Sequence, residues 1–191
     1  AAGTGPEDSI RYLLRPLQDA LRAMPTASGR ATAQDAAIRC LDSTVAVAQH
    51  FPRIVNKALL SCAFGLMGVA AGANKLPLLS RVARVAALGL PHLSAEDRAD
   101  AFKLLRPQLR LVLASESPAI LQGALELLTV VAQDASTASL ARMLHPASAA
   151  SLSRACASHE SEGVRSAWYD LLSKLWQDVS GFSPPSVEAL T

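Results

Sequence analysis

The feature that most constrains this chain of 191 residues is a helical pattern of apolar residues that occurs four times. Each copy is read at positions i, i+1, i+4, i+7, i+8 and i+11, a spacing that places side chains on one face of a helix. The copies begin at Ala37, Leu78, Ile120 and Val164, so their offsets are 41, 42 and 44 residues. Because a repeat of this length buries its apolar face only against its neighbours, the sequence predicts a stack of helices.

Composition supports an all-α fold. Half of the residues are apolar but only 4% are aromatic, so the core must consist mainly of Ala, Leu and Val, which suits closely packed helices better than strands. The helices that we expect, separated by Pro, Gly and Ser positions, cover residues 8–24, 32–50, 53–72, 76–90, 95–114, 117–133, 137–144, 147–158 and 162–178. We expect a flexible lead-in at 1–7, a single helical-repeat domain at 8–180, and a linker or disordered tail at 181–191.

Two local signals mark particular helices. Ser94 precedes Ala-Glu-Asp, a pattern typical of an N-cap with an acidic residue three positions later. The motif Leu-Leu-Arg-Pro occurs at residues 13–16 and again at 104–107, which places Pro16 and Pro107 inside helical patterns. A proline there removes one backbone hydrogen bond and kinks the helix, so we expect the two helices to occupy equivalent positions in the stack.

The segment 53–72 is apolar on nearly all sides, and residues 58–74 contain no charged side chain. Such a run is either a buried helix or a short membrane span. Seventeen residues are at the lower limit for spanning, and no Trp or Tyr flanks them, so we favour the buried helix. Gly65, Gly68 and Gly72 would then allow neighbouring helices to approach closely.

One stretch resembles a known repeat family. Residues 161–172 read Ser-Glu-Gly-Val-Arg-Ser-Ala-Trp-Tyr-Asp-Leu-Leu, which is similar to the start of the second helix of a HEAT or armadillo repeat. Residues 117–131 fit the same frame but lack the Arg, and the two earlier copies share only the apolar spacing. The resemblance implies a right-handed stack of paired antiparallel helices, about eight or nine in all, that serves as a scaffold gripping another macromolecule.

Charge is distributed unevenly along the chain although the net charge is only +2. Residues 43–115 carry nine basic and three acidic groups, whereas residues 116–191 carry four basic and eight acidic groups. No Asp or Glu occurs between Asp42 and Glu96. We therefore expect one part of the molecule to be positive and another negative.

The positive segment provides the first candidate binding residues. Lys103, Arg106 and Arg110 share one helix face, and Arg81 and Arg84 share another, so adjacent helices could join them into one patch. Three interpretations remain open: a solvated positive face with intramolecular ion pairs, a site for an acidic protein, or a site for nucleic acid or anionic lipid. Aromatic residues that would stack on bases are not interleaved with these cations.

Aromatic residues are concentrated near residue 170. Trp168 belongs to the fourth apolar copy, so we expect it to pack in the core. Tyr169 and Trp176 do not belong to that copy and are candidates for exposed anchors at an interface, or for a cap on the open end of the stack.

No pattern in the sequence indicates catalysis, a metal or a cofactor. Cys40, Cys62 and Cys156 are widely spaced and have no acid–base signature, and the four histidines form no ligand spacing with them. We therefore expect a non-catalytic protein–protein interaction scaffold, a segment or subunit of a larger assembly. The alternative is a nucleic-acid or anionic-surface binder that uses residues 43–115, and a remote alternative is a membrane-associated subunit. We expect an intracellular location, cytoplasmic by default, which leaves the nucleus or an organelle open.

Overall fold

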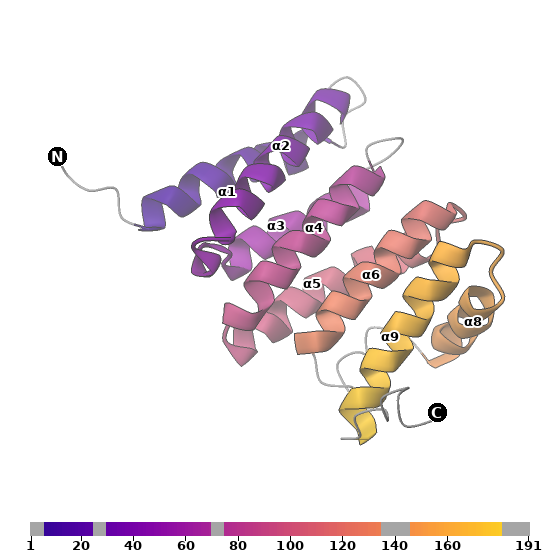
Figure 1. Ribbon diagram of the computed structural model, residues 1–191. Coiled ribbons are helices and arrows are strands. Elements are labelled where there is room, and N and C mark those ends of the chain that lie inside the picture. Colours follow the sequence, from indigo (N-terminus) through magenta and orange to yellow (C-terminus); the bar gives the residue numbers. More distant parts are fainter. Residues whose placement is uncertain (1–5, 25–29, 70–74, 135–145, 181–191) are drawn as a thin grey trace.

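The computed structural model describes residues 6–24, 30–69, 75–134 and 146–180 (Figure 1). In these residues the protein is all-helical and has no strand, which confirms the predicted all-α class. The α-helices are α1 (Pro6–Ala23), α2 (Arg30–Ala48), α3 (Lys57–Val69), α4 (Lys75–Gly89), α5 (Ala95–Leu113), α6 (Pro118–Asp134), α8 (Pro146–Ala157) and α9 (Glu162–Ser180). Two short 3-10 helices, η1 (Pro52–Ile54) and η3 (Leu90–His92), precede α3 and α5. The helix expected at 137–144 and the tail at 181–191 lie outside the described residues, and α1 begins two residues earlier than predicted.

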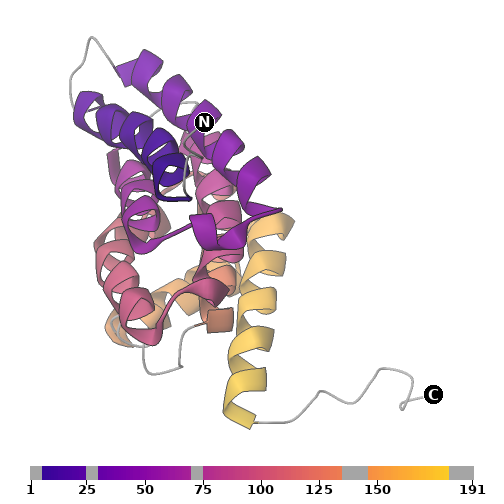
Figure 2. The ribbon, with the colours of Figure 1, turned by 90° about the vertical axis from the view of Figure 1, so that its left-hand side faces the viewer.

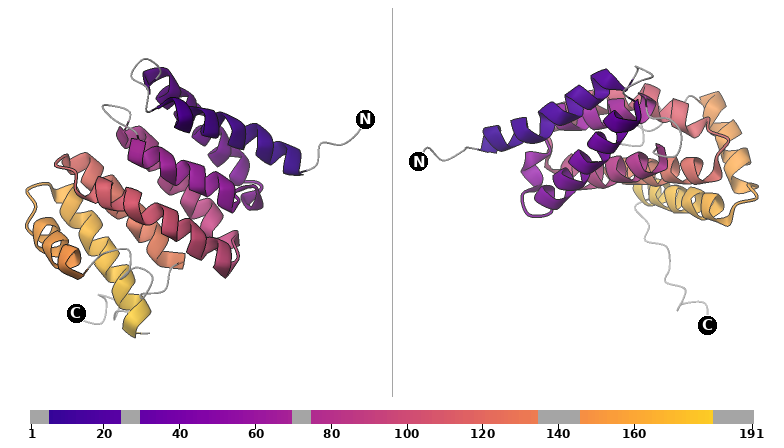
Figure 3. Two further views of the ribbon diagram at one scale, coloured as in Figure 1. Left: turned by 180° about the vertical axis from the view of Figure 1, so that it is seen from behind. Right: turned by 90° about the horizontal axis from the view of Figure 1, so that it is seen from above.

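The helices form two rows. In one row α2, α4, α6 and α9 contact each other in this order, and in the other row α3 contacts both α1 and α5 (Figure 1). Figure 2 shows the rows from the side, with α1 and α2 at the top and α9 at the lower right, and the left panel of Figure 3 shows the molecule from behind, with α1, α3 and α5 nearest the viewer. Helices that follow one another in the chain pair across the rows, as α1 with α2, α3 with α4, α5 with α6, and α8 with α9.

The four apolar copies correspond to the four helices of the first row, and their side chains line a single core. All six positions of the copy in α4 are buried: Leu78, Leu79, Val82, Val85, Ala86 and Gly89. The α9 copy follows the frame less well. Val164, Trp168 and Leu171 are buried as expected, but Leu172 is 38% exposed. Arg165 uses Nη1 to donate to the backbone oxygens of His159 and Glu160, at 2.6 and 2.9 Å, and so ties down the turn before the helix.

Glycines in α3 allow its neighbours to approach closely, as the sequence predicts. A Cβ at Gly65 would lie 3.2 Å from Cδ2 of Leu21 in α1, and a Cβ at Gly68 would collide with the side chain of Gln108 in α5. Gly72 lies outside the described residues. Buried Leu59, Leu60, Phe64 and Leu66 show that α3 contributes to the core. Among the described residues, no helix is both long and apolar enough to cross a membrane.

The predicted start of the third helix, at residue 53, is wrong. Residues 52–54 form η1, which has Pro52 in its first turn, and α3 begins only at Lys57. The reason is a cap: Oδ1 of Asn56 accepts a hydrogen bond from the backbone N of Leu59 at 3.0 Å, which satisfies a donor of the first helical turn.

Pro16 and Pro107 lie inside α1 and α5, as predicted from the repeated Leu-Leu-Arg-Pro motif. These helices lie in the same row, on either side of α3. The two copies of the motif therefore occupy corresponding places in the fold.

Candidate partner-binding surface

The five predicted cations lie on two helices of different rows. Arg81 and Arg84 belong to α4, whereas Lys103, Arg106 and Arg110 belong to α5. The helices that contact α4 most extensively are α2, α3 and α6, and those that contact α5 most extensively are α3 and α6. The cations therefore form two groups on helices that do not contact each other extensively, rather than the single patch that adjacent helices could have formed.

Arg81 and Lys103 form ion pairs inside the molecule. Nε of Arg81 donates to Oδ1 of Asp42 at 2.8 Å, and this ion pair joins α4 to α2. Nζ of Lys103 donates to Oδ1 of Asp100 at 2.8 Å, and Lys57 donates to the other oxygen of Asp100 at 2.5 Å. The hydrogen bonds from Lys103 and Lys57 lower the pKa of Asp100 to about 2, and the bond to Asp100 raises the pKa of Lys57. Intramolecular pairing thus accounts for part of the positive segment.

Arg84 and Arg106 are different because both are exposed and neither makes a hydrogen bond or an ion pair with any described residue. Arg110 is also exposed, but it takes part in an interaction within the molecule. The guanidinium groups of Arg84 and Arg106 keep their donors available for a carboxylate or phosphate.

Two exposed leucines, which were not among the predicted binding residues, lie on the same helix as Arg106. Leu104 is 49% and Leu111 61% exposed, and the exposed Pro107 lies between them at spacing i+3. The side of α5 that faces the core carries Phe102, Leu105, Leu109 and Val112 instead. The exposure of the two leucines could have been found from the sequence, because their helical spacing places them outside this buried set. We call the exposed residues Leu104, Arg106, Pro107 and Leu111 the α5 face; Leu104, Pro107 and Leu111 share one side of the helix, and Arg106 lies about 100° around the helix from Pro107.

The last helix carries the predicted aromatic residues. Trp168 is buried, which confirms its expected role in the core, whereas Tyr169 is 57% exposed. Trp176 is part of α9, but its side chain lies outside the described residues. The exposed Leu172 follows Tyr169 at spacing i+3, so both lie on one side of α9.

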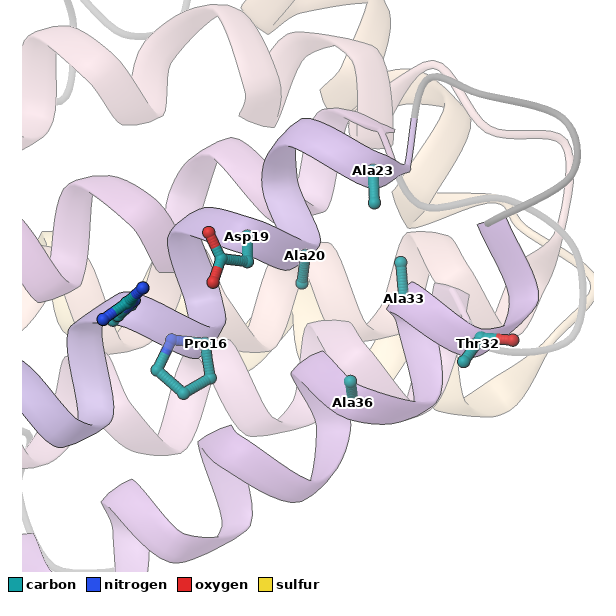
Figure 4. Close-up of a pocket in the computed structure, with 8 residues that line it drawn as sticks. Pro16, Asp19, Ala20, Ala23, Thr32, Ala33 and Ala36 are labelled. Atoms are coloured by element: carbon teal, nitrogen blue, oxygen red, sulfur yellow. The ribbon is translucent and has the colours of Figure 1, made fainter.

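A shallow groove of about 650 Å³ lies between α1 and α2 (Figure 4). Most of its lining is small and apolar, namely Pro16, Ala20 and Ala23 from α1 and Ala33 and Ala36 from α2. Arg15, Asp19 and Thr32 complete it. The remaining helices lie behind α1 and α2 in this view, so the groove opens away from the other helices. No local sequence pattern predicts the groove, because it depends on how two helices meet.

The three cysteines lie in helices, as expected, and have no disulfide partner among the described residues. Burial raises the pKa of all three thiols, Cys40, Cys62 and Cys156. Sγ of Cys40 donates to the backbone oxygen of Leu13 at 3.1 Å, a contact between α2 and α1. The described part of the chain contains no cluster of three or more His, Cys, Asp or Glu residues that could hold a metal ion.

Comparisons of the chain with protein-family models, with curated proteins and with solved structures find no match.

Proposed function

We propose that this chain is a non-catalytic protein–protein interaction scaffold, a segment or subunit of a larger intracellular assembly. The proposed architecture is a right-handed HEAT- or armadillo-like stack of paired helices. Its support is the pairing of consecutive helices across two rows, together with contacts between successive helices within each row. Stacks of this kind offer long continuous surfaces to a partner.

The α5 face carries the proposal. Isolated exposed apolar residues are normal on a protein surface, but here two leucines and an exposed proline lie at i, i+3 and i+7, and the unpaired Arg106 lies on the flank of the same helix. Apolar side chains that a partner can bury, next to a cation that it can pair, are typical of protein interfaces. The partner that fits this face best presents apolar side chains together with carboxylates.

Nucleic acid fits less well. Phosphate binding requires several cations along one surface, whereas these cations are divided between α4 and α5, and Arg81 and Lys103 are already paired with carboxylates. Leu104 and Leu111 have no role in contacts to phosphate. We keep nucleic-acid binding as an outcome of the experiment below.

The experiment is affinity capture of the tagged chain from cells, with two variants. The first replaces the α5 face (Leu104→Ser, Arg106→Glu, Leu111→Ser), and the second replaces the unpaired arginine of the other row (Arg84→Glu). We expect the first variant to lose its partner proteins at least about tenfold, and Arg84→Glu to retain them, because Arg84 lies on α4 and not on the α5 face. Circular dichroism checks that both variants are folded.

Undiminished capture by the first variant would overturn the role of the α5 face. If no protein is captured but RNA or DNA is recovered with an affinity that falls steeply with salt, the nucleic-acid alternative replaces the proposal.

A further inference from the structure

The two ends of the first row carry features that differ in shape. At one end α2 forms, with α1, the groove lined by Pro16 and four alanines. At the other end lies α9 (Figure 1), and its exposed side chains include Tyr169 and Leu172. Small residues at the first end leave space, and large residues at the second end occupy space. The two ends are therefore complementary in size.

The groove also carries an exposed positive charge. Arg15 lines it, is exposed, and makes no hydrogen bond or ion pair with any described residue. The other charged residue of the lining, Asp19, lies 3.4 Å from Nη1 of Arg22, an ion pair along α1. Arg15 is thus the charge at the groove that remains available.

The residue after Tyr169, Asp170, has a charge opposite to that of Arg15. Asp170 is exposed and, within the part of the chain that the structure describes, has no hydrogen-bonding or ionic partner. Asp170 lies about 100° around α9 from Tyr169, so its carboxylate is at the edge of the surface that Tyr169 and Leu172 expose. Its charge is opposite to that of Arg15, whose guanidinium lines the small-residue groove at the other end. Arg–carboxylate pairs of this kind add direction to an apolar contact.

These two features cannot meet within one molecule, because α1 and α2 lie at the opposite end of the stack from α9 (Figure 1). Contact between them requires two molecules, and it joins different surfaces of the two. An interface of this type is heterologous, so each added copy leaves one groove and one α9 surface free.

We propose that copies of this chain associate head to tail, with Tyr169 and Leu172 of one copy in the groove of the next and Asp170 facing Arg15. This association is separate from the partner binding at the α5 face, which lies on a different helix.

Sedimentation velocity of the 191-residue chain over a range of concentrations tests the proposal. The unmodified chain should form species that grow with concentration. A groove variant (Ala36→Glu) and an α9 variant (Tyr169→Ser, Leu172→Ser) should each remain monomeric. Their mixture should give a one-to-one dimer and nothing larger, because the pair retains one intact groove and one intact α9 surface. Phe51→Ser, at another exposed aromatic residue, is the matched control and should associate like the unmodified chain.

Charge reversal gives a second test that leaves the apolar residues in place. Arg15→Asp alone should weaken association at least about tenfold, and the double variant Arg15→Asp, Asp170→Arg should recover most of it. An unmodified chain that is monomeric at every concentration overturns the proposal, as does a variant mixture that stays monomeric. A dimer that persists in both single variants also overturns it, since such a dimer uses other surfaces. Partner capture through the α5 face is measured independently of all these results.

Discussion

Gly89, the last residue of α4, is the position where the absence of a side chain matters most for packing. A Cβ at this position would lie 2.7 Å from Cβ of Val55, a buried residue between η1 and α3. Cβ of Val55 is attached directly to the backbone and cannot rotate away. At Gly65 the nearest atom would be a terminal methyl carbon of Leu21, 3.2 Å away, which can move. The two glycines therefore differ in how much a methyl group costs.

We predict that Gly89→Ala lowers the free energy of unfolding by about 1–3 kcal/mol, the usual cost of overpacking. Gly65→Ala is the matched control and should be close to neutral or stabilising by up to about 1 kcal/mol, because alanine favours helix more than glycine does. Urea unfolding followed by circular dichroism measures both values. Equal losses in the two variants would show that the space beside Val55 is not the cause.

At the scale of the helix, the start of α5 depends on one side chain. Oγ of Ser94 accepts a hydrogen bond from the backbone N of Asp97 at 3.1 Å, and its hydroxyl donates to Oδ2 of Asp97 at 2.9 Å. Glu96 and Asp97 add negative charge in the first turn, where the helix dipole favours it. This is the cap that the sequence predicts.

We predict that Ser94→Ala reduces the free energy of unfolding by about 1 kcal/mol, and Ser94→Gly by only a few tenths, because glycine is a much better N-cap than alanine. Thermal or urea unfolding can resolve the difference. Ser43→Ala, at an exposed serine inside α2, is the control and should change stability by less than about 0.5 kcal/mol. If Ser94→Gly and Ser94→Ala lose the same amount, the cap is not what stabilises this end of α5.

The position and the buried residues of a helix were predictable where neighbouring helices of its row cover one of its faces. α4 and α6 contact a helix on either side within their row, and their apolar spacing gave both elements and buried residues. The start of α3 was not predictable from apolar pattern, because Arg53, Ile54 and Val55 are compatible with helix and the boundary is set by Pro52 and the Asn56 cap. Leu172 belongs to the apolar copy of α9 but is exposed. Unlike α4 and α6, α9 has extensive contacts with only one helix of its row, α6, among the described residues.

At the scale of the whole molecule, tertiary contacts decide which charges remain available. The pair Lys103–Asp100 is three residues apart on one helix and can be expected from sequence. Arg81–Asp42 and Lys57–Asp100 join residues 39 and 43 positions apart, so no local pattern predicts them. The sequence thus located these cations on two helices but could not distinguish Arg84 and Arg106, which have no ionic partner among the described residues, from the paired Arg81 and Lys103. The α1–α2 groove has the same origin in tertiary structure.

Contacts between the helices of the first row also predict how the protein unfolds. The buried residues of α2 and α9 belong to one continuous core cluster, linked through α4 and α6. If the helix pairs stack as proposed, stability comes from each pair and from the interfaces between neighbours, and a short array with strong interfaces unfolds as one unit. Residues 8–180 should therefore behave as a single domain.

We test this with Leu41→Ala in α2, which removes a fully buried side chain at the opposite end of the row from α9. Such a substitution costs about 2–5 kcal/mol. In a Trp176→Phe background the fluorescence comes from Trp168 alone, which is buried in α9. If the stack is one cooperative unit, the unfolding midpoint measured by Trp168 must shift as far as the midpoint measured by circular dichroism. Ala46→Ser, at an exposed position of α2, should shift neither. A Trp168 transition that stays in place while the circular dichroism transition broadens would mean that α9 unfolds independently of α2, and the chain would then hold more than one folding unit.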